Sequence, residues 1–174
     1  MTDFSGILKE IIENHKDDNK WVESKHEEIK RVSNSKVGSI GEEFIEKLCY
    51  EYKLDCLFPL DHKGNRARQS PWDIEINGVK IELKTATEDV SGSFQFNHIR
   101  YHRPYEAVIC LGIAPSNIYF NIWSKADIVT GKAGNLVSME KGGNASYKLT
   151  KKPSGLNNIN LFSELILNFT NNFI

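Results

Sequence analysis

The dipeptide Asn77-Gly78 lies between two stretches in which polar and apolar residues alternate. A two-residue type I′ turn requires positive φ at both central positions, and asparagine and glycine adopt that conformation most easily. With these two residues at the turn, Ile74 lies opposite Ile81. Because successive side chains in a strand point to opposite faces, the pattern predicts a hairpin with one apolar face and one charged face.

The charged face of this hairpin brings two acids together. The predicted register places Asp73 opposite Glu82 with a Cβ separation of about 5 Å, whereas Glu75 opposite Lys80 is an ordinary cross-strand ion pair. Two facing carboxylates repel each other, and a divalent cation between them turns that repulsion into binding. Lys84 adds an ammonium group on the same face. The pattern indicates a metal site, and the alternative is a surface hairpin with solvated charges.

The order of these residues resembles a known active site. Pro71 and Asp73, followed after the turn by Glu82-Leu83-Lys84, resemble the active site of the PD-(D/E)xK nuclease superfamily, to which the type II restriction endonucleases belong. One residue, Trp72, is inserted between the proline and the aspartate. The resemblance implies that Asp73, Glu82 and the backbone carbonyl of Leu83 hold Mg²⁺, with Mn²⁺ as a substitute. It also implies that Lys84 orients or deprotonates the attacking water.

The strongest helical pattern runs from Ser39 to Tyr52. Three glutamates lie in its early turns, where acids also favour the helix dipole: Glu42, Glu43 and Glu46. Many members of the superfamily enter a core helix through a Gly-x-x-Gly-Glu-like sequence whose glutamate reaches the metal. Residues 38–42 read Gly-Ser-Ile-Gly-Glu. The resemblance therefore implies that Glu42 is a third catalytic acid and metal ligand, with Glu43 and Glu46 as alternatives.

Two polar segments are candidates for binding DNA. The loop from Leu60 to Gln69 directly precedes the hairpin, and its cations either contact phosphate or are simply solvated. The segment from Ser93 to Arg103 interleaves aromatic residues with side chains that read base edges or hold phosphates. Its alternative is a helix or loop with aromatic core contacts and a wet polar face. The predicted DNA-binding residues are Lys63, Arg66, Arg68, Gln95, Asn97, His98, Arg100 and Arg103.

The remaining pattern predicts an α/β (α+β) fold with a central mixed β-sheet flanked by helices. The resemblance describes this as a restriction-endonuclease-like core. We expect helices over residues 3–52 with a break at 16–20, strands at 56–58, 105–113, 118–123 and 146–150, and helices at 124–129 and 161–173. The chain of 174 residues is expected to form one nuclease domain. Residues 1–35 form a helical extension, 36–130 the catalytic core, and 131–174 the C-terminal loops and helix.

Composition limits the class of protein. Hydrophobic residues make up 40% of the chain and the net charge is −1, which is typical of a soluble globular protein and gives no overall basic field. Cys49, Cys56 and Cys110 lack metal-ligand spacing, so we expect reduced thiols. The first residues lack the features of a signal peptide and no apolar run reaches membrane-spanning length. We therefore expect a cytoplasmic protein that does not bind membranes.

These observations predict a Mg²⁺-dependent DNA endonuclease that hydrolyses phosphodiester bonds in double-stranded DNA. The predicted role is a type II restriction endonuclease or its small catalytic subunit, acting as a homodimer or in a heteromer with a recognition subunit. Two alternatives stay open within the same fold: a repair or junction-resolving nuclease, and a non-catalytic DNA-binding module. A third is an unrelated protein with a charged surface hairpin.

Overall fold

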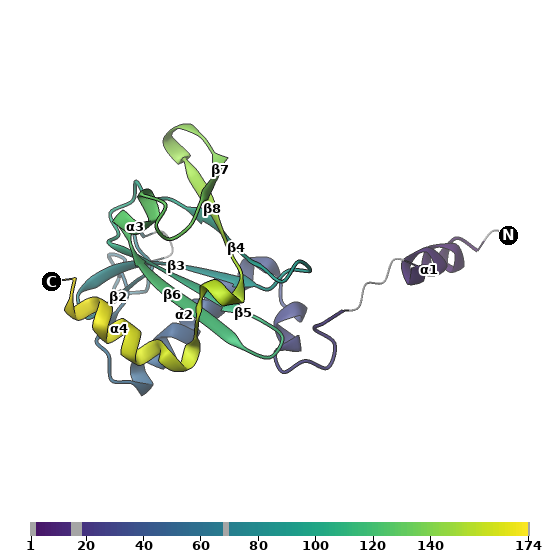
Figure 1. Cartoon of the computed structure of the whole chain (residues 1–174), viewed down its shortest axis with the longest axis horizontal. Helices are drawn as coiled ribbons and strands as arrows, with labels where there is room; N and C mark the ends of the chain where they lie inside the picture. Colours follow the sequence, from purple (N-terminus) through teal and green to yellow (C-terminus); the bar gives the residue numbers. More distant parts are fainter. Residues whose placement is uncertain (1–2, 15–18, 68–69, 174) are drawn as a thin grey trace.

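The structure is a computed structural model, and it describes residues 3–14, 19–67 and 70–173 (Figure 1). Its centre is a six-stranded sheet in the order β1-β2-β3-β5-β6-β9. The parallel pair β3–β5 lies in the middle, and the other pairs are antiparallel. The strands are β1 (Cys56–Leu57), β2 (Ile74–Ile76), β3 (Val79–Thr87), β5 (Ala107–Ile113), β6 (Ile118–Ser124) and β9 (Asn157–Asn158). The predicted mixed sheet flanked by helices is confirmed.

The hairpin between β2 and β3 has the predicted register, with Ile74 paired to Ile81. Asn77 and Gly78 both have positive φ, at 49° and 82°. The Asn77 side chain also fastens the turn to the rest of the protein: it accepts a hydrogen bond from the backbone of Asp55 and donates one to Thr170. The turn chemistry and these two contacts fix which residues of β3 face each side of the sheet.

One face of the central sheet is covered by α2 (Asn34–Glu51) and α4 (Phe162–Asn171) (Figure 1). Ile45 of α2 and Phe162 of α4 are fully buried in the same apolar cluster as Ile81 and Ile109 of the sheet. All seven residues of β5 are buried, as expected for a strand that is covered on both faces. Helix α4 therefore docks against the body of the protein.

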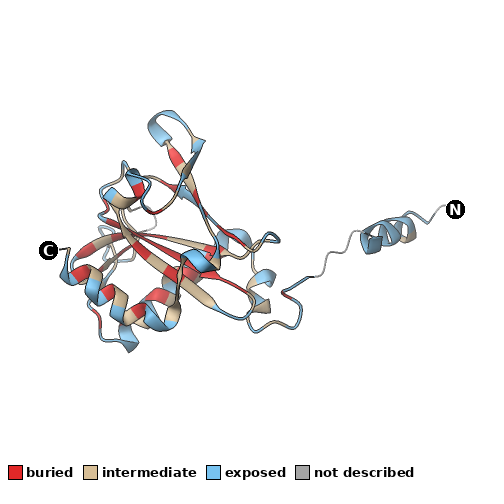
Figure 2. Ribbon diagram, viewed as in Figure 1, coloured by how far each residue is buried: buried red, intermediate tan, exposed pale blue. Residues whose placement is uncertain are grey.

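The opposite face carries a three-stranded antiparallel sheet and the short helix α3 (Lys125–Val129). The strands, in spatial order, are β4 (Phe94–Ile99), β8 (Ser146–Lys151) and β7 (Leu136–Glu140). Phe94, Phe96 and Leu149 point inward and form a second core with Val108 of β5. Figure 2 shows the buried residues concentrated where these layers meet, and exposed residues along the hairpin of β7 and β8.

Several element predictions are wrong. The segment 93–103, for which a helix or loop was the alternative interpretation, contains strand β4, whose phenylalanines alternate with exposed polar residues. Helix α2 begins at Asn34, before the predicted Ser39, and β7 was not predicted. Residues 21–32 form turns and a single 3₁₀ helix, η1 (Glu27–Arg31). Their apolar face is thin, and the segment is held instead by buried Trp21 and by a hydrogen bond between His26 and the backbone of Ala114.

The remaining elements are short or peripheral. Helix α1 (Phe4–Asn14) has no buried residue and lies apart from the body of the protein in Figure 1. The other 3₁₀ helices are η2 (Gly142–Asn144), η3 (Pro153–Gly155) and η4 (Ile159–Leu161). Cys49, Cys56 and Cys110 are free thiols, as predicted. No helix in the described ranges is long and apolar enough to cross a membrane.

Candidate active site

Asp73 lies where β2 stops pairing with β3. The ladder ends at Ile74, but the backbone N–H of Asp73 still donates to Ile81 O at 2.9 Å. The carboxylate Oδ2 of Asp73 then accepts a hydrogen bond from Leu83 N at 2.8 Å. Because the N–H and C=O of one residue in a strand point to the same side, the Leu83 carbonyl also faces the side of Asp73. The Asp73 carboxylate and the Leu83 carbonyl thus lie on the same side of β3.

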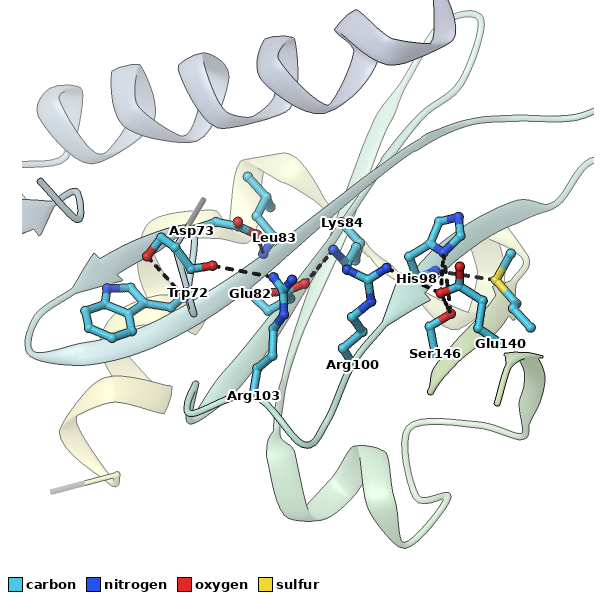
Figure 3. A network of polar contacts seen from close by, with 12 residues as sticks. Trp72, Asp73, Glu82, Leu83, Lys84, His98, Arg100, Arg103, Glu140 and Ser146 are labelled. Carbon is cyan, nitrogen blue, oxygen red and sulfur yellow. Dashed lines mark hydrogen bonds and ion pairs between the residues drawn. The ribbon is translucent and has the colours of Figure 1, made fainter. Parts of the chain in front are cut away.

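Glu82 is the most unusual charged residue of the site, because only 1% of its surface is exposed. Its Oε1 atom forms an ion pair with Lys84 Nζ at 2.5 Å, as Figure 3 shows. Its Oε2 atom is buried and has no hydrogen-bond partner in the described part of the chain. Burial raises the pKa of Glu82; Lys84 opposes that rise, and the negative charge of Asp73 adds to it. One oxygen of this buried carboxylate is therefore left without a hydrogen-bond partner among the described residues.

Glu42 reaches the same region from helix α2. The helix lies close to β3 at Gly41, where an added Cβ would stand 1.9 Å from Thr85 Oγ1. The Glu42 carboxylate pairs with Arg66 at 2.8 Å. Burial raises the pKa of Glu42, as does the nearby charge of Asp73, and Arg66 opposes them. Its neighbour Glu46 lies 3.7 Å from the same guanidinium. The described residues contain no group of three acids, histidines or cysteines placed to hold a metal, so a metal-binding Glu42 stays a prediction.

A pocket of about 290 Å³ opens between α2 and the loop that leads into β2. Its lining includes Ser39, Glu42, Arg66, Ser70, Trp72 and Asp73. The guanidinium of Arg66 also lies over the Phe58 ring, 3.6 Å from its centre. The pocket therefore has carboxylates and a stacked arginine in its wall, and this suits it to a charged ligand.

The turn after β4 brings two arginines toward the acids. Arg103 N donates to Arg100 O at 3.0 Å, and the Arg103 side chain donates to Ser70 O at 3.4 Å. The positive charge of Arg103 acts against the rise in the pKa of Glu82, which shows that the guanidinium lies near this carboxylate. Figure 3 shows Arg103 beside Glu82. A phosphate held at the acids would have Arg103 in reach, whereas the side chain of Arg100 pairs with Glu140.

The other predicted DNA contacts lie farther out. Gln95 is exposed on β4, and its amide donates to Asp89. Asn97 and His98 are exposed at an irregular point of β4, where His98 has a positive φ of 57°. Lys63 is exposed in a turn that Asp61 holds. Arg68 lies outside the described residues. The DNA-binding roles of all these residues stay predictions.

The sequence reasoning missed Tyr105. This residue is 2% exposed, and its hydroxyl has no hydrogen-bond partner in the described ranges. Burial raises the pKa of Tyr105, and the negative charge of Glu82 adds to the effect. Tyr105 lies two residues before β5, at the start of the predicted strand 105–113, and its place in that pattern is typical of an ordinary core aromatic. No signal in the sequence distinguishes it, because its place beside Glu82 depends on the pairing of β3 with β5.

Comparisons with known proteins add little. No protein-family model matches the chain, and no curated protein matches it. One similar solved structure is the bacterial homing endonuclease I-Ssp6803I, which is 13% identical in sequence. The match covers 69% of this chain and 75% of that chain, with a TM-score of 0.43. A TM-score of this size is too low to support any conclusion about family or activity.

Proposed function

We propose that the protein is a divalent-cation-dependent endonuclease that hydrolyses phosphodiester bonds of double-stranded DNA at Asp73, Glu82 and Lys84. One observation carries this proposal: Glu82 is buried, one of its oxygens pairs with Lys84, and the other is unpartnered in the described part of the chain. A buried carboxylate oxygen without a partner is unfavourable, so sites of this kind serve to bind or react.

The donor set suits a hard cation. Asp73, Glu82 and the Leu83 carbonyl offer only oxygen, which Mg²⁺ and Mn²⁺ prefer, and Mg²⁺ sites in proteins commonly use only one or two carboxylates. Glu42 is the third acid near this donor set. It would have to give up its ion pair with Arg66 before it could bind the cation. A bound cation would lower the pKa of water and neutralise charge on the phosphate.

The protein's own groups have separate roles in this reaction. Lys84 orients the attacking water through its ammonium group, or takes the proton of the water at Nζ if Nζ is neutral, and Glu82 Oε1 holds the lysine side chain in place. Arg103 donates hydrogen bonds to phosphate oxygens as negative charge develops on them. Asp73 is fixed by the N–H of Leu83, so its carboxylate does not have to be ordered when substrate arrives. The products are expected to carry 5′-phosphate ends.

Within this class we favour a type II restriction endonuclease or its small catalytic subunit, working as a homodimer or beside a recognition subunit. The support is the order of Pro71, Asp73, Glu82 and Lys84 along the hairpin. A repair or junction-resolving nuclease has the same chemistry, and the two differ in the fragments that they produce.

The test is cleavage of a panel of plasmid and phage DNA with Mg²⁺ and then Mn²⁺. Wild type is compared with Asp73→Asn, Lys84→Met and the control Glu75→Gln. Glu75 is half-buried on the same hairpin but pairs across the strand with Lys80. We expect wild type and the control to cut and the two site variants to fail.

Discrete fragments support a restriction enzyme, and nicks or smears support a repair nuclease. Cleavage that survives in both site variants overturns the assignment of the site. Absence of cleavage by wild type under all conditions, together with retained DNA binding, favours the non-catalytic module.

A further inference from the structure

The positive charge of this protein is concentrated in one segment. Residues 131–155 contain five lysines and one glutamate, a net charge of +4. The whole chain has a net charge of −1, so the rest of it carries −5. This segment contains β7, β8 and the turn between them, and Figure 1 shows the hairpin projecting from the body of the protein. Such asymmetry is a feature of surfaces that bind polyanions.

Three of the five lysines have no side-chain hydrogen bond or ion pair within the described ranges. Lys132 pairs with Asp127, and Lys151 donates to the backbone of Ala133. Lys141, before the hairpin tip, and Lys152, after β8, are exposed, and Lys148 is half-buried in the middle of β8. Structural contacts therefore account for two lysines and leave three for another role.

The direction of these side chains follows from the strand. Leu149 points into the core, so Lys148 and Thr150 point to the outer face of the small sheet. Lys152 has extended backbone angles that continue the alternation to the same face. Thr150 pairs with Gln95 of β4, which is exposed on this face as well. The outer face thus combines ammonium groups with an amide that is able to read a base edge.

The hairpin is also joined to the candidate active site by polar contacts. Glu140, at the end of β7, accepts hydrogen bonds from Ser146 Oγ at 2.7 Å and from Arg100 at 3.3 Å. Arg100 shares a turn with Arg103, whose charge acts on Glu82. Figure 3 shows the contacts of Asp73, Glu82 and Lys84 and, on the other side of the same view, the contacts of Glu140 with Arg100 and Ser146. A long ligand bound at the acids would extend along the network to the hairpin.

We propose that the β7–β8 hairpin binds the DNA duplex by lying in the major groove, with Lys141, Lys148 and Lys152 on backbone phosphates. The inference rests on the proposed function and adds the element that holds the substrate. A two-stranded ribbon fits the major groove of B-form DNA, which is about 12 Å wide. The major groove of A-form RNA is too narrow and deep for side chains to read, so DNA is the expected partner.

The test measures duplex binding by fluorescence anisotropy over a range of salt concentrations. The Lys84→Met background keeps the DNA intact. One triple variant carries Lys141→Ala, Lys148→Ala and Lys152→Ala. The control carries Lys9→Ala, Lys25→Ala and Lys47→Ala, three exposed lysines outside the hairpin that give the same change in net charge.

The hairpin variant is expected to reduce the slope of log K against log salt by about 3, and to weaken binding at least about tenfold at 0.1 M salt. The control is expected to keep the slope of the Lys84→Met protein. Equal slopes for the two triple variants overturn the inference, and the proposed function stands if wild type still cuts. Failure of wild type to bind or cut any duplex overturns both. Lysine-dependent binding of duplex RNA in preference to DNA also overturns the inference.

Discussion

Gly41→Ala tests the contact that places helix α2 against β3. An added Cβ would stand 1.9 Å from Thr85 Oγ1 and 2.8 Å from Thr85 Cβ, so the helix must move or Thr85 must change rotamer. Overpacking of this kind costs about 1–3 kcal/mol, and the better helix propensity of alanine offsets up to about 1 kcal/mol. The net loss of about 1–2 kcal/mol lowers Tm by roughly 2–8 °C in a domain of this size. Cleavage should also fall, because Glu42 is the next residue of the helix.

A second substitution identifies the cause. Thr85→Ala removes Oγ1, the atom of the closest clash, and Cγ2, but keeps Cβ; the hydroxyl that it removes is buried and has no partner in the described residues. In the Gly41→Ala background it should restore part of the lost stability, with a coupling energy of about 1 kcal/mol or more by urea unfolding. Thr85→Val keeps the branched shape and should restore none. A Gly41→Ala protein as stable as wild type, or strictly additive effects in the double variant, would refute the reasoning.

Four further predictions follow from the structure. Lys84→Met should slow plasmid cleavage at least about 100-fold in single-turnover assays, because the lysine acts on the attacking water. Mg²⁺ at ten times its Kd should stabilise wild type by about 1.4 kcal/mol in thermal unfolding, and Glu82→Gln should remove this effect. Hydrogen bonds from Ser91 hold the pKa of Asp89 at about 2, below its unfolded value, so its stabilisation is present above pH 4 and disappears as pH falls through about 2. Asp89→Asn should therefore lose about 1 kcal/mol at neutral pH, after allowance for solvent screening, and little near pH 2 in urea unfolding. Phe162→Ala should cost about 3–5 kcal/mol by the same method, because the ring is fully buried between α4 and the sheet.

The sequence predicted best those features that depend on neighbouring residues. The register of β2 and β3 follows from the backbone conformation of Asn77 and Gly78, and the predicted helix at 124–129 is close to α3, which starts at a capping box of Ser124 and Asp127. The start of α2 was misplaced because its N-cap residue, Ser33, makes no side-chain capping bond. Strand β4 was misread because its register depends on β8, which lies about fifty residues further along the chain.

The same distinction holds at the candidate site. Asp73, Glu82 and Lys84 were recognisable because one tight turn brings them together. The pair between Arg66 and Glu42 was not, since it depends on how a loop folds over a helix. Tyr105 and Arg103 approach Glu82 only because β5 pairs with β3, a contact that no local pattern predicts.

The most direct test of the central claim is to locate the cation. Crystals of the protein soaked in Mn²⁺ should show anomalous scattering beside the carboxylates of Asp73 and Glu82 and the carbonyl of Leu83. The peak should vanish in Glu82→Gln crystals and persist in Glu75→Gln crystals. A wild-type protein that cleaves DNA with Mn²⁺ but binds the ion elsewhere, or retains the peak without Glu82, would contradict the account.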